Sequence, residues 1–257
     1  MAFSADWLAL REPVDHASRD GALLAQATAL AGQNAAVADL GSGTGSTARA
    51  FTDDMCQGWS WRFFDSDKAL LTIASKRHPS SQSHQFDLAD ISTLDFGNIN
   101  LVTASALLDL MPQSWVEALA QKLSHAGVPF YASLNYNGVM HWSPPGDEDA
   151  SITGAFNEHQ RTDKGLGPAL GPASASETMR IFQSHGFTVI AGDSPWRLDA
   201  QTIALHEATL EGIASAASDA GCEGASDWLD HRKTHLASTT GYIGHTDLLA
   251  IPHDRRP

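Results

Sequence analysis

Short apolar runs alternate along most of the chain with stretches whose apolar residues recur at helical spacing. The runs predict strands, and they lie at 37–40, 59–64, 84–88, 100–106, 128–135, 187–192 and 242–251. The stretches with helical spacing lie at 22–31, 46–51, 68–76, 115–119, 177–182 and 199–236. Alternation of strand and helix predicts a parallel sheet joined by right-handed crossovers. We therefore expect an α/β fold with seven strands and a ligand site at their carboxyl ends.

The alternation stops at 136–176, where aromatic residues, prolines and glycines follow one another without a clear period. A short helix is predicted at 155–163 within this stretch. Long loops inside compact domains are often lids or binding segments, so we expect 136–176 to be an inserted substrate cover, with a plain surface elaboration as the alternative. We interpret 1–257 as one domain, 1–33 as an N-terminal helical cover, and the last strand as split or bulged at Gly244.

Composition and charge narrow the classes of function. The 42% hydrophobic content suits a packed globular protein, and no apolar run reaches the length of about 18 residues that a membrane span needs. A net charge of −14 repels phosphate backbones, so we expect no nucleic-acid partner. Cys56 and Cys222 are too few for a disulfide framework. Because Asp6 precedes any basic residue and no signal-type apolar region follows, we expect a cytoplasmic protein.

A glycine-rich turn joins the first predicted strand to the helix that begins near Ser46. Its glycines stand at 41, 43 and 45, where missing Cβ atoms let a ligand lie against the backbone. A dinucleotide fingerprint would need glycine at position 46, and no Gly-Lys-Ser/Thr of a P-loop follows. Asp39 precedes the turn, and its charge would repel a pyrophosphate but suits a ligand that carries an ammonium group.

The string Asp39-x-Gly41-x-Gly43-x-Gly45 resembles motif I of the class I S-adenosylmethionine-dependent methyltransferases. The resemblance implies that this loop, with Ser42 and Thr44, holds the methionine part of the cofactor. It also implies that an N-terminal segment covers the cofactor, where Arg11 would meet the carboxylate or remain a solvated surface charge. The fold it implies is a Rossmann-like, mostly parallel seven-stranded sheet with helices on both faces and an antiparallel last strand.

Polar residues at the ends of the other predicted strands extend the expected cofactor site. Asp65, followed by Ser66, ends the second strand at the spacing of a ribose-binding carboxylate, and Asp67 is expected to cap the next helix. In the resembled family an aspartate after the third strand contacts adenine. Asp87, followed by Leu88, fits that place, although Asp90 and Asp95 lie close enough to be alternatives. Ser105 ends the fourth strand, and Asp109, just beyond it, receives no role.

Methyl transfer from a sulfonium needs a nucleophile placed in line with the methyl carbon and, for a protonated acceptor, a base. The candidate bases are His141, His159 and Asp163, with Tyr136 as a weaker one. Histidine suits the task because it titrates near neutrality, but most of the 12 histidines must be incidental. The candidate substrate-binding residues are Asn135, Tyr136, Trp142, Asn157 and Gln160. Glu158, His159 and Asp163 have no ligand spacing, so we expect no metal.

The leading functional hypothesis is an S-adenosylmethionine-dependent methyltransferase that acts on a small-molecule acceptor by in-line methyl transfer. A second hypothesis is a non-catalytic S-adenosylmethionine-binding regulator or scaffold. A nicotinamide-dependent oxidoreductase is a third, and Ser46 in place of the required glycine argues against it. The sequence leaves the acceptor, its reacting atom and the oligomeric state open.

Overall fold

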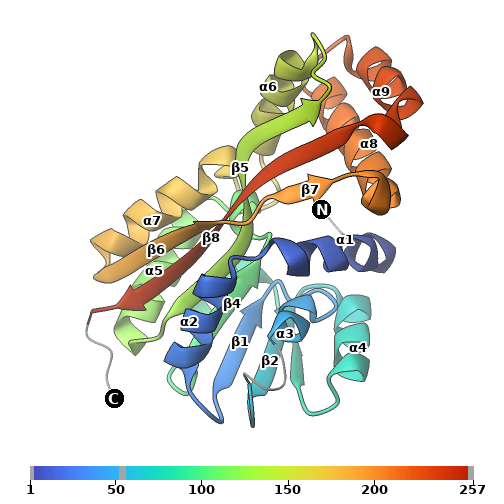
Figure 1. Ribbon diagram of the computed structural model, residues 1–257. Helices are drawn as coiled ribbons and strands as arrows, with labels where there is room; N and C mark the ends of the chain where they lie inside the picture. Colours follow the sequence, from blue (N-terminus) through green and yellow to red (C-terminus); the bar gives the residue numbers. More distant parts are fainter. Residues whose placement is uncertain (1–2, 52–55, 254–257) are drawn as a thin grey trace.

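The structure is a computed structural model that describes residues 3–51 and 56–253 (Figure 1). In this part of the chain eight strands form one sheet, in the order β3-β2-β1-β4-β5-β8-β6, and the short β7 pairs with β8 off that path. The strands are β1 Ala36–Leu40, β2 Ser60–Asp65, β3 Gln82–Gln85, β4 Leu101–Ser105, β5 Phe130–Ser143, β6 Phe187–Asp193, β7 Trp196–Leu198 and β8 Thr240–Pro252.

Strands β1 to β5 run parallel, and β8 runs antiparallel to both β5 and β6. The predicted α/β sheet with an antiparallel last strand is therefore confirmed, and the predicted count of seven strands omits only β7. The chain leaves β1 toward β2 on one side and returns to β4 on the other. This reversal of strand order opens a crevice at the carboxyl ends of β1 and β4, where ligands of such sheets bind.

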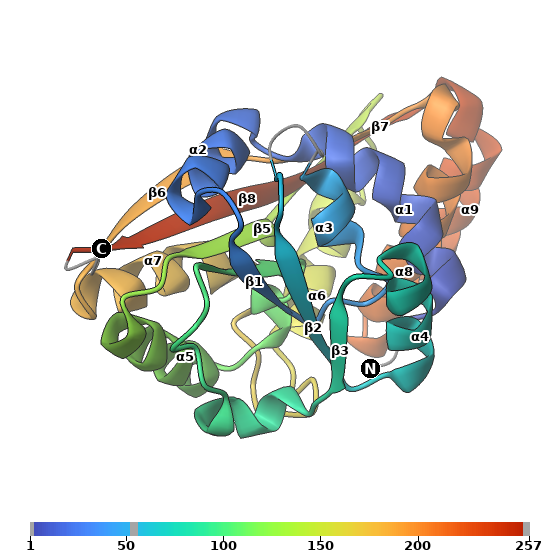
Figure 2. The same ribbon diagram turned by 90° about the horizontal axis from the view of Figure 1, so that it is seen from below.

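Helices cover both faces of the sheet (Figure 2). The helices of the described residues are α1 Ala5–Ser18, α2 Gly21–Ala31, α3 Ser46–Ala50, α4 Lys68–Arg77, α5 Gln113–Ala126, α6 Asp149–Gln160, α7 Ser174–Ser184, α8 Ile203–Asp219 and α9 Ala225–Thr234. Apolar residues of α5 and α7 pack on one face, and those of α2, α3 and α4 pack on the other. Asp67 accepts hydrogen bonds from the N–H groups of Ala69 and Leu70 at the start of α4, so its predicted capping role is confirmed.

Strands β5 and β8 continue past the sheet as a long antiparallel arm (Figure 1). The prediction that residues 136–143 are irregular is wrong, because this segment pairs with the first half of β8. The last strand is not split at Gly244, because β8 is continuous. One of the two register shifts between β5 and β8 does lie at Gly244, and both shifts place the extra residues in β5. Leu134 and Gly138 have positive φ angles of 57° and 87° at these two places, which bends the arm.

The buried carboxylate of Asp247 holds the first bend. It accepts hydrogen bonds from the Tyr131 hydroxyl (2.8 Å), the Leu134 N–H (2.8 Å) and the Asp20 N–H (3.0 Å). Asp247 thereby joins the start of α2 to β5 and β8. Three donors around one carboxylate stabilise a charge that burial alone would disfavour.

The far end of the arm has its own hydrophobic core with α6, α8 and α9 (Figure 1). Trp142 packs edge-on against Trp228 of α9, and Ile152 of α6 is fully buried there. The expected cover at 136–176 is therefore one half of a larger lobe, and residues 203–234 supply the other half. The sequence could not predict that α8 and α9 pack with the cover, because they follow it in the chain only after the whole of β6.

Candidate functional site

A cavity of about 540 Å³ lies at the carboxyl ends of β1, β2 and β4. Its size falls within the range of about 300–1,000 Å³ typical of small-ligand sites. The glycine loop forms its floor, α1 closes one side, and the 164–166 loop closes another. Of the predicted cofactor-binding residues, those that line it are Arg11, Gly41, Ser42, Gly43, Thr44, Asp65, Ser66, Asp87, Leu88 and Ser105.

The glycine loop needs its glycines for their backbone geometry. Gly41, Gly43 and Gly45 have φ angles of 65°, 53° and 79°, in the left-handed region that L side chains avoid. Asp65 fixes the loop, because its carboxylate accepts the Gly43 N–H at 2.8 Å. Gly45 does not line the cavity, and it is the N-cap residue of α3.

Asp39 lies beneath the loop, fully buried, and does not line the cavity. Its carboxylate accepts the Thr103 hydroxyl hydrogen bond at 2.7 Å, and its other oxygen has no partner in the described part of the chain. Burial raises the pKa of Asp39 to about 7, against the opposing Thr103 hydrogen bond and the charge of Arg19. Asp39 therefore lies behind the loop. The predicted direct contact between Asp39 and an ammonium group of the ligand is not possible from this position.

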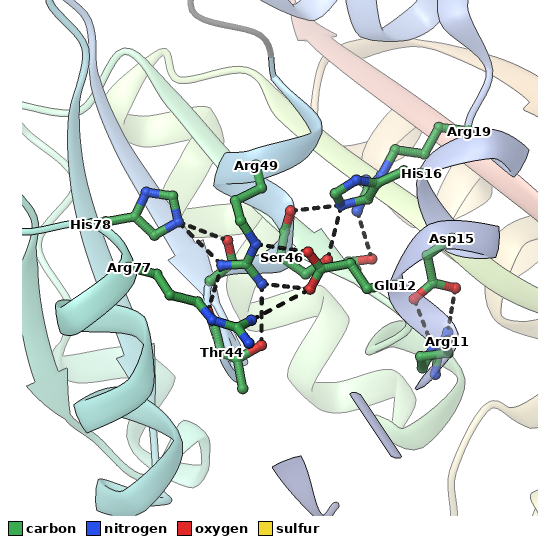
Figure 3. A network of polar contacts seen from close by, with 12 residues as sticks. Arg11, Glu12, Asp15, His16, Arg19, Thr44, Ser46, Arg49, Arg77 and His78 are labelled. Carbon is green, nitrogen blue, oxygen red and sulfur yellow. Dashed lines mark hydrogen bonds and ion pairs between the residues drawn. The ribbon is translucent and has the colours of Figure 1, made fainter. Parts of the chain in front are cut away.

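Helix α1 is fastened to the glycine loop by a cluster of charged residues (Figure 3). Arg49 of α3 donates to both carboxylate oxygens of Glu12, at 2.7 and 2.5 Å, and to the Thr44 carbonyl at 2.7 Å. His16 Nε2 lies 3.0 Å from the Ser46 hydroxyl. Of the predicted 1–33 cover, α1 thus lines the cavity, whereas α2 packs on the sheet. Residues 1–2 of that cover lie outside the described residues.

Two arginines of the cover lie near the cavity. Arg11 lines it and forms a two-point ion pair with Asp15, with a shortest distance of 2.7 Å. Its guanidinium also stacks 4.7 Å from the Trp196 ring centre. The alternative in which Arg11 is a solvated surface charge is therefore wrong.

Arg19, which sequence reasoning missed, is 8% exposed and donates to the hydroxyls of Ser105 and Ser133. Its Nε has no partner among the described residues, and it forms no ion pair with any of them. Only its position between two helical segments could have marked it in the sequence.

A second cavity of about 430 Å³ adjoins the first and shares Phe3, Arg11, Ala106 and Leu110 with it. Its walls come from α1, β5, α6, α8 and β8, so it lies between the sheet and the outer lobe. The predicted residues Tyr136, His159 and Gln160 line it. Asn157 does not, but its side-chain oxygen accepts the Tyr136 hydroxyl hydrogen bond at 2.7 Å.

Four other predicted residues lie away from both cavities. Asn135 is fully buried and donates to the Ala132 and Thr246 carbonyls, so it serves the first bend of β5. Trp142 belongs to the core of the outer lobe. His141 is exposed on the opposite face of β5, because successive strand residues alternate. Asp163 is exposed, and its carboxylate accepts the N–H groups of Gly165 and Gly167, which lower its pKa and make it a poor base.

Two buried ionisable residues line the second cavity, and neither is assigned a role by the sequence. Asp109, in the 3-10 turn Leu108–Leu110, is 8% exposed, and His245 of β8 is 6% exposed. Burial raises the pKa of Asp109 to about 6, and burial followed by the charge of Arg11 lowers the pKa of His245 to about 3. Within residues 3–51 and 56–253, no group of three or more metal-ligating side chains comes together. No helix in those ranges has the length and apolar character to cross a membrane.

Comparisons with known proteins add to this geometry. No protein-family model matches the chain, and no curated protein matches it by sequence. Solved structures do match. The cyclopropane synthase MmaA2 from Mycobacterium tuberculosis is 11% identical, with a TM-score of 0.53 over 96% of this chain and 94% of its own.

Two further structures were determined with ligands. A methyltransferase from Thiobacillus denitrificans in complex with S-adenosyl-L-homocysteine is 15% identical, with a TM-score of 0.50 over 98% of this chain and 100% of its own. A geranyl diphosphate methyltransferase in complex with GPP and sinefungin is 13% identical, with a TM-score of 0.50 over 90% of this chain and 76% of its own. Identities this low bear on the fold alone. Together with the strand order and the glycine loop, they show that this chain has the fold of the class I S-adenosylmethionine-dependent methyltransferases.

Proposed function

We propose that the protein is an S-adenosylmethionine-dependent methyltransferase that acts on a small-molecule acceptor. The observation that carries the proposal is the pair of adjoining cavities. One lies on the glycine loop at the switch point of the sheet, and the other opens from it between sheet and outer lobe. A transfer reaction needs two such sites in contact, so that donor and acceptor meet at their border.

The residues of the first cavity fit the cofactor. The Ser42 hydroxyl is buried without a partner in the described part of the chain, which leaves it available to a ligand. Cβ atoms at Gly41 and Gly43 would approach Leu107 and Leu8 to 3.1 Å, so these glycines keep the floor of the cavity open. We assign the loop and Ser42 to the methionine part, Asp65 to the ribose and Asp87 with Leu88 to the adenine. The bound cofactor would supply a methyl group on a sulfonium leaving group.

Arg11 is better placed than Arg19 to bind the cofactor carboxylate, because it lines the cavity and Asp15 fixes its orientation. Arg19 acts behind it, where it holds the Ser105 hydroxyl at the end of β4. Their positive charges also balance the two buried aspartates nearby, since Arg19 acts on Asp39 and Arg11 on Asp109. A small acceptor is favoured because α1, α6 and α8 surround the second cavity.

Titration calorimetry with S-adenosylhomocysteine tests the proposal. We expect binding to the unmodified protein, and a loss of at least tenfold in Gly43→Ala, since a side chain at φ 53° strains the loop and crowds Leu8. Gly186→Ala is the matched control, because Gly186 has a φ of 84° and open space around it far from the cavity. Absence of binding, or equal affinity in both variants, would contradict the proposed site.

Turnover separates this proposal from a non-catalytic regulator. Methyl transfer from labelled S-adenosylmethionine to components of a metabolite extract is expected. Firm cofactor binding without any labelled product would favour the regulator.

A further inference from the structure

The wall of the second cavity is mostly apolar and aromatic. Trp7, Met140, Phe156 and Trp196 line it, and Ile213 comes from α8. A ligand that filled this space would gain free energy mainly by removing its own apolar surface from water. The body of the ligand is therefore apolar.

Charges of both signs line the cavity, from Arg11, the buried Asp109 and the exposed Asp219. Arg11 is already paired with Asp15, and burial keeps the His245 imidazole neutral at physiological pH, because its pKa is about 3. The carboxylate of Asp109 faces the positive charges of Arg11 and Lys164, whose Coulomb interactions act on it. Tyr136, His159 and Asp219 are the further titratable residues of the lining. The pKa of Tyr136 is raised, first by burial and then by Asp109. A ligand with a full charge of either sign would meet a like charge here.

One oxygen of the Asp109 carboxylate nevertheless lacks a hydrogen-bond donor in the described part of the chain. This oxygen, Oδ1, is buried and has no partner among the described residues, and the same is true of His245 Nδ1. A buried acceptor without a donor costs free energy that a ligand can recover by supplying one. These two atoms are the polar groups of the cavity that nothing in the described chain satisfies.

We propose that the second cavity binds a neutral acceptor with an apolar, preferably aromatic body and a single hydroxyl group that donates its hydrogen bond to the Asp109 carboxylate. The role of this ligand as methyl acceptor rests on the proposed function, but its binding to the cavity does not. It can be tested without any cofactor, so failure of one leaves the other measurable.

Calorimetry with three naphthalene derivatives is the test, at about pH 8, where Asp109 is ionised. Naphthol carries the hydroxyl donor, methoxynaphthalene lacks it and naphthoate is an anion. We expect naphthol to bind at least tenfold more tightly than methoxynaphthalene, since a hydrogen bond to a charged acceptor is at stake. Naphthoate should bind more weakly than naphthol, because the Asp109 carboxylate repels it.

Asp109→Asn separates a direct contact from a structural role. The amide is the same size but uncharged, so naphthol should bind about fivefold to tenfold more weakly while naphthoate binds more tightly. A variant that merely loosened the cavity would weaken both. Methoxynaphthalene should change by less than about twofold.

Gly212→Leu identifies the cavity in which the probe binds. Gly212 lies on α8 at the cavity and a Cβ built there meets no atom within 4 Å, so a leucine should occupy the ligand space without distorting the helix. Gly154→Leu on α6 is the matched control, with equally open surroundings outside both cavities. Naphthol binding should fall at least tenfold only in Gly212→Leu. Equal binding of naphthol and methoxynaphthalene, tightest binding of naphthoate, or an unaffected Gly212→Leu would each overturn the proposal.

Discussion

The ion pair between Glu12 and Arg49 carries the sharpest prediction about the cover of the cofactor cavity. The side chains are 18% and 21% exposed, and two hydrogen bonds join them at 2.7 and 2.5 Å. Arg49 also donates a hydrogen bond to the Thr44 carbonyl of the glycine loop, so the ion pair links α1 to the floor of the cavity (Figure 3). Replacing either partner should loosen α1.

The magnitude follows from the geometry. Hydrogen bonds to charged groups contribute roughly 1.5–3 kcal/mol each, whereas an exposed pair contributes about 0–1 kcal/mol. For this partly buried two-point pair we expect a coupling free energy of about 1–3 kcal/mol. The exposed pair of Glu177 and Arg180 on α7 has side chains 35% and 59% exposed, so its coupling should stay below about 1 kcal/mol.

A double-mutant cycle in urea measures this coupling. Glu12→Gln, Arg49→Met and the double variant give the first value, and Glu177→Gln with Arg180→Met gives the control. A coupling free energy for Glu12 and Arg49 no larger than the control would refute the reasoning. Glu12→Gln should also weaken S-adenosylhomocysteine binding, because α1 supplies Arg11 to the cavity.

The pH dependence of the same pair has a definite sign. The hydrogen bonds from Arg49 are the main cause that lowers the pKa of Glu12 from its ordinary 4.5. The folded protein therefore holds this proton less firmly than the unfolded chain does. The stabilisation is complete above the ordinary pKa and is lost as the pH falls below it.

Two further predictions concern the buried ionisable groups of the arm. The imidazole of His245 has a pKa lowered from 6.5 to about 3 by burial, so the free energy of unfolding should fall by up to about 1.4 kcal/mol per pH unit as the pH drops through that window. His245→Phe should flatten the curve, and His141→Phe, at an exposed position of β5, is the comparison variant. Asp247→Asn should lower the free energy of unfolding by about 2–5 kcal/mol, because it replaces a carboxylate that accepts three hydrogen bonds. Asp193→Asn on the exposed side of β6 is its control in urea, and equal losses in the two would contradict the assigned role.

The sequence by itself determined the sheet and most of the first cavity. The periods that predict strands and helices are local properties of the sequence. The glycines at 41, 43 and 45 likewise indicate a turn with left-handed backbone conformations, whatever the tertiary contacts. Asp65, Asp87 and Ser105 could be grouped in advance, because parallel strands end at the same edge. Their convergence on one cavity follows from topology alone.

Only the tertiary structure decided what surrounds the second cavity. Its walls combine α1, β5, α6, α8 and β8, which are far apart in the sequence. No local period could show that β5 runs on to Ser143, since its partner for that stretch is β8 at the other end of the chain. Asp163 and His141 looked as suitable for chemistry as Asp109 and His245 do. Burial separates them, and burial is a property of the packed lobe, which brings together surfaces that no short stretch of sequence contains.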